Sequence, residues 1–378
     1  MNALFLHDRN DLEAEVAGGV QICTREFLAI VRAAAESTMV FPVETSRHWL
    51  DRLQRKLRIQ AYRNFRPDDY KASLRSVVAS GKITHAFLNR SELIRFGELL
   101  KQISPQVKVV VMSHGNQSGD DLYEVSGPAG RRSAGWARWQ ATWTLGLDLV
   151  TESSARHRTI DAMVVMSREE AVMERWLGAS QVVVLPRLLH FAPLERTPSP
   201  GKVGYVGTLD HTPNLVALEA ILEELARRNL PDLEIRLVGS PEHNGHRLAA
   251  QYPFITYLGR LNDDALQREA STWELFLNPI FWLSRGASMK LRTALAWGLP
   301  VLTSRSGARG YEWNAVNLPT SADSASDFCD QMAVLLSSPD ALNDAAAASR
   351  AVVESSPTLD ALGRRLRATV DPAALDAQ

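Results

Sequence analysis

Residues 275–304, "LFLNPIFWLSRGASMKLRTALAWGLPVLTS", contain the pattern of a complete strand, turn, helix and strand. A short apolar run, Leu275 to Leu277, leads into a glycine-containing turn, a helical pattern from about Ser288, and a second apolar run in "PVLTS". The start of such a helix has four unpartnered N–H groups and about half a positive charge. The stretch therefore predicts an anion-binding turn in an α/β sheet, although a plain turn with solvated charges has the same pattern.

The candidate anion-binding groups are the backbone donors of this turn and two neighbouring cations. Arg285 and Lys290 supply the cations, and no carboxylate occurs between Phe281 and Ser304. This combination suits a diphosphate. The backbone donors are those of Gly286, Ala287, Ser288 and Met289.

The same alternation of strand-like and helix-like segments runs through both halves of the chain. Residues 211–229 predict a helix capped by Thr212, with Pro213 in its first turn. Its apolar face consists of Leu215, Leu218, Leu222 and Leu225. Apolar runs typical of buried parallel strands lie at 3–8, 37–43, 84–89, 107–115, 161–167, 202–209, 233–240, 255–261 and 274–279.

Prolines at positions 186, 193, 198 and 200 separate the two halves. This spacing resists both helix and central strand, so residues 186–201 are predicted to form a linker. We expect Rossmann-like domains over 1–185 and 202–355, and a helix over 356–378 that packs back on the N-terminal domain. The expected fold class is α/β, with two Rossmann-like domains facing each other across a cleft and ligands beyond the carboxyl ends of the strands.

Composition excludes several classes of function. The 378 residues include 42 basic and 43 acidic ones, so no global field attracts nucleic acid. No apolar run approaches the roughly 18 residues of a membrane span, and the first ten residues have no basic leader, so we expect a cytoplasmic protein. Cys23 and Cys329 are too few for a disulfide framework. No Asp-x-Asp and no His/Cys cluster occurs, so we expect no metal or other cofactor.

Three sequence blocks resemble the donor-binding half of a known enzyme family. Residues 202–221, 257–279 and 285–311 are similar, in order and spacing, to the C-terminal half of group 1 (family 4) glycosyltransferases of the GT-B fold. The N-terminal "GGVQ" at 18–21 and "SHG" at 113–115 are consistent with the acceptor-side domain of the same family. The resemblance implies transfer of a sugar from a nucleotide diphosphate.

The resemblance also implies roles for individual residues of the donor half. Lys290 matches the lysine that meets the donor diphosphate, and Gly286 matches a glycine that lets backbone approach the phosphates. Gly207 and Thr208, at the end of the strand "KVGYVGTL", are further donor-binding positions.

Three residues of the N-terminal half match family positions near the sugar. Gly18 and Gly19 match a loop close to the sugar and phosphate, and His114 matches a histidine that contacts the transferred sugar. A tight strand-to-helix turn at the glycines and a buried structural histidine remain alternatives.

The sequence departs from the family at two carboxylates. Members carry two glutamates eight positions apart, the second of which binds the ribose hydroxyls. Those positions fall on Arg285 and Thr293, neither of which is acidic. A neutral threonine should hold ribose less strongly than a carboxylate.

The loop "SRSGARGY" at 304–311 adds cations near the expected site. Arg305 and Arg309 are candidates for phosphate contact, with plain surface arginines as the alternative. Glu312 is the nearest carboxylate downstream.

Residues 47–66 combine seven Lys or Arg and one Asp with interleaved apolar side chains. Such a segment suits an anionic membrane surface, at the inner face of the membrane, or a lipid-diphosphate acceptor; a solvated helix packed by one face is the alternative.

A second aromatic segment follows further along the chain. Trp136, Trp139 and Trp143 recur at helical spacing, which we expect to pack into a core rather than to form a sugar-stacking platform.

The expected function is that of a retaining, metal-independent glycosyltransferase with His114, Lys290 and Arg285 as catalytic candidates. The expected partners are a nucleotide sugar and a glycan or lipid-linked acceptor in bacterial-type polysaccharide or glycoconjugate synthesis. A catalytically inactive binding subunit and a sugar-nucleotide epimerase on the same fold are the alternatives.

Overall fold

The chain folds into two units in this computed structural model. One unit comprises Met1–Leu188 and Pro357–Gln378, and the other comprises Leu189–Ser356. We refer to them as the N-terminal and the C-terminal unit and treat each by itself. The structure describes residues 1–13, 18–57, 62–127, 135–228, 230, 232–282, 286–312 and 317–371.

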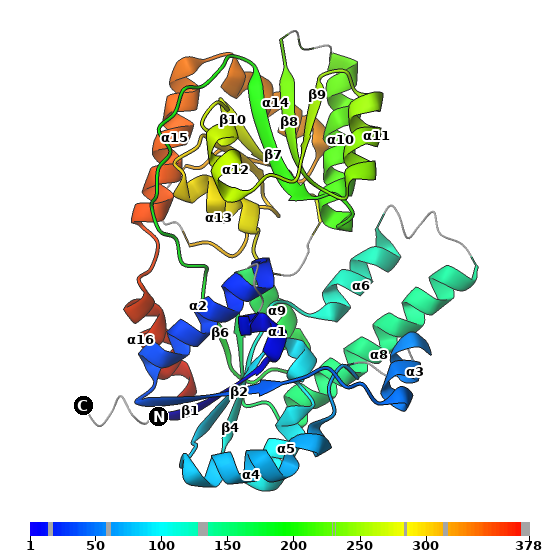
Figure 1. The fold of residues 1–378 in the computed structure, drawn as a ribbon, viewed down its shortest axis with the longest axis vertical. Helices are drawn as coiled ribbons and strands as arrows, with labels where there is room; N and C mark the ends of the chain where they lie inside the picture. Colours follow the sequence, from blue (N-terminus) through cyan, green and yellow to red (C-terminus); the bar gives the residue numbers. More distant parts are fainter. Residues whose placement is uncertain are drawn as a thin grey trace. The chain divides into compact units, whose positions relative to one another are not determined.

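The N-terminal unit contains a parallel sheet with strand order β2-β1-β3-β4-β5-β6 (Figure 1). Its central strands are apolar on both faces because helices cover both sides, as in the fully buried run of β3. The predicted strands of this half are confirmed, whereas the short β6 was not predicted from the sequence. The strands are β1 (Asn2–Asp8), β2 (Ser37–Val43), β3 (His85–Asn89), β4 (Lys108–Met112), β5 (Ala162–Val165) and β6 (Val182–Val184).

Helices and two 3₁₀ turns connect these strands. Helix α9 shows a local reason for its start, since Ser167 and Glu170 form a reciprocal capping box. Helix α16 packs on α2, and its end is tied to the sheet because His85 Nε2 lies 3.1 Å from the Val370 carbonyl oxygen. The helical elements are α1 (Arg9–Glu13), α2 (Gly19–Ala34), α3 (Trp49–Leu57), η1 (Pro67–Tyr70), α4 (Lys71–Ser80), η2 (Ser91–Leu93), α5 (Phe96–Ile103), α6 (Gln117–Ser126), α8 (Trp136–Arg158), α9 (Arg168–Trp176) and α16 (Leu359–Val370).

The C-terminal unit contains a second parallel sheet, with strand order β12-β11-β10-β7-β8-β9. Two buried clusters, one around Phe328 and one around Trp273, line its two faces. The predicted strands of this half are confirmed. The strands are β7 (Lys202–Thr208), β8 (Glu234–Ser240), β9 (Ile255–Gly259), β10 (Leu275–Asn278), β11 (Val301–Ser304) and β12 (Thr320–Ser321).

Helix α10 of this unit confirms the predicted apolar face but not its predicted cap. Leu218, Leu222 and Leu225 are buried, but the helix already includes Thr212, and the His211 carbonyl accepts from Asn214 and Leu215 instead. The cap prediction was therefore one residue late. The helices are α10 (Thr212–Arg228), α11 (Glu242–Gln251), α12 (Asp263–Ala270), α13 (Met289–Ala296), α14 (Ala325–Leu336) and α15 (Pro339–Glu354).

Each sheet has one point where the strand order reverses. In the N-terminal sheet, β1 lies between β2 and β3, so the chain order reverses between β1 and β3, and the carboxyl ends of these two strands flank that point. In the C-terminal sheet, β7 and β10 are the corresponding pair. Ligands of open parallel sheets bind at such points. A ligand-binding site is therefore expected near Asp8 and Asn89 in the N-terminal unit and near Thr208 and Asn278 in the C-terminal unit.

Among the described helices, none has both the length and the apolar composition that crossing a bilayer requires.

Candidate functional site

The start of helix α13 lies beside the reversal point of the C-terminal sheet. Ser288 is its N-cap, and the Ser288 hydroxyl accepts from Leu291 N at 3.4 Å and donates to Asn278 Oδ1 at 2.9 Å. Tyr311 donates its hydroxyl hydrogen to the Ser288 carbonyl. The anion-binding turn predicted from the sequence therefore does begin a helix at Ser288, and polar side chains fix that helix end to β10.

Two glycines let the backbone around this helix end come close together. Gly286 has a φ of 73°, in the left-handed region that glycine tolerates best. A Cβ on Gly310 would lie only 2.3 Å from the Cβ of Ala287, so the turn and the following loop pack in direct contact. This close packing fixes the direction of the backbone at the start of the helix.

Lys290 reaches from α13 to the end of β7. Its Nζ donates to Asn214 Oδ1 at 2.9 Å and to the Tyr205 hydroxyl at 3.2 Å, and it lies 4.6 Å from the centre of the Tyr205 ring. Asn214 in turn donates its amide hydrogen to the Thr208 carbonyl at 3.1 Å. Lys290 is thus held at the carboxyl edge of the sheet by neutral groups.

The charge of Lys290 has no negative counterpart among the described residues, where no carboxylate pairs with it. Burial lowers the pKa of the Lys290 amine from 10.5 to about 7, because desolvation penalises the ammonium form. An anion placed beside Nζ would reverse that penalty. A partly buried lysine with neutral partners and a lowered pKa is therefore a candidate functional residue.

The other donor-side candidates are less committed to ligand binding. Thr293 donates its hydroxyl hydrogen to the Met289 carbonyl at 3.2 Å, so its oxygen is left only as a neutral acceptor. Arg305 is exposed, whereas Arg309 is buried and its Nε–H donates to the Ser306 carbonyl at 2.7 Å. Glu312 is partly buried.

Arg285, Gly207 and Thr208 are the remaining donor-side residues predicted from the sequence. Arg285 lies outside the described residues. Gly207 and Thr208 end β7, where Thr208 is exposed and Gly207 is partly buried.

Sequence reasoning missed two side chains of this site, Tyr205 and Asn214. Both lie in "KVGYVGTLDHTPN", within a block that carries the family resemblance, but neither residue type by itself indicates a lysine partner. Asn214 stands 76 positions from Lys290, and only the tertiary fold brings them together.

His114 follows β4 in the N-terminal unit and belongs to a polar network at the reversal point. Its Nε2 lies 3.1 Å from Asn89 Oδ1, and the Asn89 amide nitrogen donates to Asp11 and Thr24 at 3.1 and 2.9 Å. Because the amide nitrogen of Asn89 makes both of those bonds, Asn89 Oδ1 must accept from His114. The Phe27 ring meets the His114 ring edge-on at a centroid distance of 5.4 Å, so the imidazole is fixed on two sides.

Arg90 closes this network through a strained backbone. Its φ of 82° is unusual for a residue other than glycine and costs about 1–3 kcal/mol. Its guanidinium pairs with Asp11 and Glu92, both at 3.0 Å. Burial raises the pKa of the Asp11 carboxyl, while Arg90 opposes that rise. Strain held by ion pairs beside a strand end is typical of a functional site.

Gly18 and Gly19 stand at the start of α2. Gly18 is the N-cap with φ −87°, and its N–H donates to Gln21 Oε1 at 3.0 Å. Neither glycine has a positive φ, so the backbone angle does not require glycine there. Both are exposed, which leaves room for a ligand at the helix start.

The prediction that the tryptophans of α8 pack into a core is wrong. Trp136, Trp139 and Trp143 are 71%, 53% and 51% exposed, and their rings stack with centroid distances of 4.5 and 6.0 Å. The buried stripe of α8 is instead mostly polar and consists of Leu145, Asp148, Glu152 and Arg156. Glu152 accepts from Ser118 and Tyr62, and Arg156 pairs with Glu174, so both of these charges have polar partners inside the unit.

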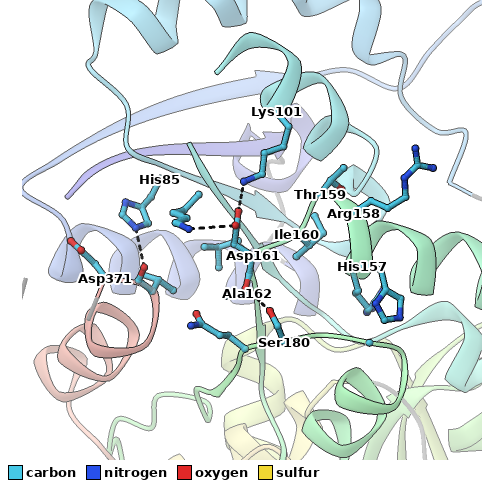
Figure 2. Close-up of a pocket in the computed structure, with 16 residues that line it drawn as sticks. His85, Lys101, His157, Arg158, Thr159, Ile160, Asp161, Ala162, Ser180 and Asp371 are labelled. Atoms are coloured by element: carbon cyan, nitrogen blue, oxygen red, sulfur yellow. Dashed lines mark hydrogen bonds and ion pairs between the residues drawn. The ribbon is translucent and has the colours of Figure 1, made fainter. Parts of the chain in front are cut away.

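A cavity of about 630 Å³ lies at the opposite edge of the N-terminal sheet (Figure 2). It borders the first residues of β3, β4 and β5, which are the amino ends of those strands. Figure 2 shows Lys101 bonded to Asp161, at 2.7 Å, and Lys108 lies 3.7 Å from the same carboxylate. Because this carboxylate already binds both lysines, and because the cavity is remote from the reversal point, we do not assign the sugar chemistry to it.

Metal ligands do not gather anywhere in the described parts of the chain: no three His, Cys, Asp or Glu side chains there are placed to hold an ion.

Comparison with known proteins gives a family match within the C-terminal unit. Residues 200–338 match the family described as Glycosyl transferases group 1. No curated protein sequence matches the chain significantly.

Solved structures show the fold of the whole chain. Sucrose-phosphate synthase from Thermosynechococcus elongatus is 15% identical with a TM-score of 0.69, and the match covers 100% of this chain and 99% of that one. HepE from Anabaena, solved with UDP and glucose, is 12% identical with a TM-score of 0.62 and full coverage of both chains. Trehalose-6-phosphate synthase OtsA is 13% identical with a TM-score of 0.57, covering 100% and 98%. Together these findings show the GT-B fold for the whole chain and a match of residues 200–338 to the group 1 glycosyltransferases.

Proposed function

We propose that this protein transfers a sugar from a nucleotide diphosphate donor, bound by the C-terminal unit, to a glycan or lipid-linked acceptor bound mainly by the N-terminal unit. The observation that carries the proposal is Lys290, a partly buried lysine at the reversal point of the sheet whose described partners are all neutral and whose pKa is lowered by desolvation. A diphosphate would supply the missing negative charge. HepE, a protein of the same fold, was solved with UDP and glucose, so UDP-glucose is the first donor to test.

In this scheme the donor's glycosidic C–O bond breaks and its electron pair leaves with the diphosphate, while the oxygen of an acceptor hydroxyl forms the new bond to the anomeric carbon and its proton passes to the departing diphosphate. Lys290 and the N–H groups at the start of α13 stabilise the departing diphosphate. These fixed charges are organised before the donor arrives, so little reorganisation is needed during the reaction. The N–H group of His114 Nε2 donates to Asn89, which fixes the ring, and in this scheme His114 contacts a hydroxyl of the transferred sugar.

Metal independence belongs to the proposal, because Lys290 and the helix start provide positive charge where a metal ion would otherwise be needed. Transfer rates that are unchanged after chelation with EDTA are expected, and a loss of activity restored by Mg²⁺ would contradict it. Retention at the anomeric carbon is also proposed, and an NMR spectrum of the first product formed would show it directly.

The decisive experiment measures donor turnover and UDP-glucose binding for the wild type and for Lys290→Ala. We expect kcat/KM to fall at least 100-fold, because an interaction with the departing charge is lost. Arg292→Ala, on the same helix, is the matched control and should retain most of the activity. Unchanged kcat/KM in Lys290→Ala would remove the assigned role.

A catalytically inactive binding subunit is the second candidate, and the neutral Thr293 at the ribose-binding position favours it. Such a subunit would bind UDP-glucose without turning it over. A panel of sugar nucleotides tested with calorimetry and with turnover assays separates the two functions.

A further inference from the structure

A second cavity, of about 510 Å³, lies in the N-terminal unit at the carboxyl ends of β1 and β2. It is therefore on the ligand-binding edge of that sheet, the same edge to which Asn89 and His114 belong. Three arginines line it, Arg9, Arg47 and Arg52, together with the polar residues Asn10, Thr45 and Ser46.

The charges of this cavity are not balanced. Arg9 pairs with Glu44, which also lines the cavity, but in the described parts of the chain neither Arg47 nor Arg52 forms an ion pair. Asp51, the single acidic residue between positions 47 and 57, is buried and accepts from the Ser46 hydroxyl at 2.6 Å. Two exposed guanidinium groups therefore remain for an anion, and guanidinium binds phosphate oxygens in a bidentate manner.

The same segment continues into an unusually apolar surface. Helix α3 begins two residues after Arg47, and its side chains Trp49, Leu50, Leu53 and Leu57 are 65%, 41%, 43% and 53% exposed. A fully polar acceptor would bind the arginines but would leave these apolar side chains exposed to water. An amphiphile, with an anionic head and an apolar tail, matches both features at once.

Helix α8 of the same unit also has exposed apolar side chains. It is linked to the segment that follows α3, because Tyr62 donates its hydroxyl hydrogen to Glu152 of α8. Helix α8 turns three tryptophans outward, and its first three turns bury no side chain before Leu145. Tryptophan is the residue most typical of a membrane–water boundary.

We propose that the acceptor carries a lipid-linked phosphate group in addition to its reacting hydroxyl, that this phosphate binds Arg47 and Arg52 in the cavity, and that the apolar chain lies along the exposed face of α3. The inference rests on the proposed function for the role of this ligand as acceptor. It adds the chemical class of that acceptor and the residues that recognise it.

Three probes separate the parts of such a ligand: farnesyl phosphate below its aggregation concentration, farnesol, and glucose 6-phosphate. Binding is measured by calorimetry without any donor. The wild-type protein should bind farnesyl phosphate at least tenfold more tightly than either of the other two, because only that probe has both head and tail.

Two double variants divide the site, and all four positions are on the surface, so folding should be unaffected. Arg47→Ala with Arg52→Ala should weaken farnesyl phosphate at least tenfold and leave farnesol unchanged. Leu53→Gln with Leu57→Gln should weaken both farnesyl ligands and leave glucose 6-phosphate unchanged. Arg158→Ala, an exposed arginine elsewhere in the unit, is the matched control.

Two results would overturn the inference. Glucose 6-phosphate binding as tightly as farnesyl phosphate would identify a soluble phosphate acceptor, and farnesol binding as tightly would show that the arginines do not read the head group. UDP-glucose binding of the same variants is measured in parallel. If the variants still bind UDP-glucose, failure of the lipid probes counts only against this inference; if even the wild type does not, the proposed function fails separately.

Discussion

Binding of a diphosphate donor should take up a proton through Lys290. Burial holds the pKa of this amine at about 7, so at neutral pH about half of the protein molecules carry it uncharged. A bound diphosphate would favour the ammonium form and raise that pKa again. Both phosphates of UDP-glucose are already ionised over the neutral range, so the proton must come to the protein. Uptake should be about 0.1 proton per bound molecule at pH 6, about 0.5 at pH 7 and about 0.9 at pH 8.

The same argument fixes the pH dependence of affinity. If only the ammonium form pairs with the diphosphate, the observed Kd is the intrinsic value divided by the protonated fraction. That fraction falls from about 0.9 at pH 6 to about 0.5 at pH 7 and about 0.01 at pH 9. The Kd should therefore rise about twofold from pH 6 to pH 7 and about 50-fold from pH 7 to pH 9.

Isothermal titration calorimetry in two buffers of different ionisation enthalpy measures proton uptake directly. Lys290→Arg is the informative variant, because guanidinium stays protonated throughout this range. It should bind UDP-glucose with no uptake and with a flat pH profile, whereas Lys290→Met should bind weakly at every pH. If the wild type binds without proton uptake at pH 8 and with a Kd independent of pH, either the amine is not held neutral or it does not meet the donor.

Four further outcomes follow from the structure. Without ligand, the free energy of unfolding of the wild type should rise between about pH 7 and pH 10.5, relative to that of Lys290→Met. In this pH range the unfolded chain binds the Lys290 proton more tightly than the folded protein does. Denaturant titrations at several pH values would show the rise. Thr293→Glu should lower the Kd for UDP-glucose about tenfold, because a carboxylate accepts hydrogen bonds from the ribose hydroxyls more strongly than a threonine does. Thr293→Val should change this Kd little. Equal affinity in the wild type and both variants would show that this position does not face the ribose. His114→Ala should reduce kcat about 100-fold with the UDP affinity unchanged, because UDP is assigned to the other unit; a parallel loss of UDP binding would argue against that division. The double variant Trp139→Ser with Trp143→Ser should have nearly the melting temperature of the wild type, because both side chains are exposed. Phe87→Ala, in the fully buried β3, should lower the free energy of unfolding by about 3–5 kcal/mol. A large loss of stability in the tryptophan variant would mean that this face of α8 is covered.

The strands and the fold class could be predicted because they depend on local pattern. Residues 86–88 are apolar at three successive positions, which is typical of a strand covered on both faces, and the structure buries all of β3. The short β6 escaped prediction because three valines are too few to indicate a strand. The beginning of α13 was predictable too, since Ser288 caps it through its own side chain.

The direction in which α8 faces could not be predicted from its period. Spacing of i, i+3 and i+7 shows that the three tryptophans share one face, but not that this face lies against the core. The structure buries Asp148, Glu152 and Arg156 instead. Tyr62 and Ser118 donate to Glu152, and Arg156 pairs with Glu174. Those partners come from three other segments, so no pattern within α8 itself indicates that its polar stripe can be buried.

The donor site shows the same division between local and distant information. Lys290 was predicted from its place in a turn-and-helix pattern. The neutral surroundings that favour anion binding, however, are provided by Tyr205 and Asn214. Both are neutral, and an aspartate in place of Asn214 would pair with the amine and keep it charged without any ligand. The family's lost glutamates therefore need not mean a lost site. In this chain the donor side lacks acidic groups near Lys290 among the described residues, so the ligand itself is the strongest source of negative charge, and its binding and the protonation of Lys290 should rise and fall together.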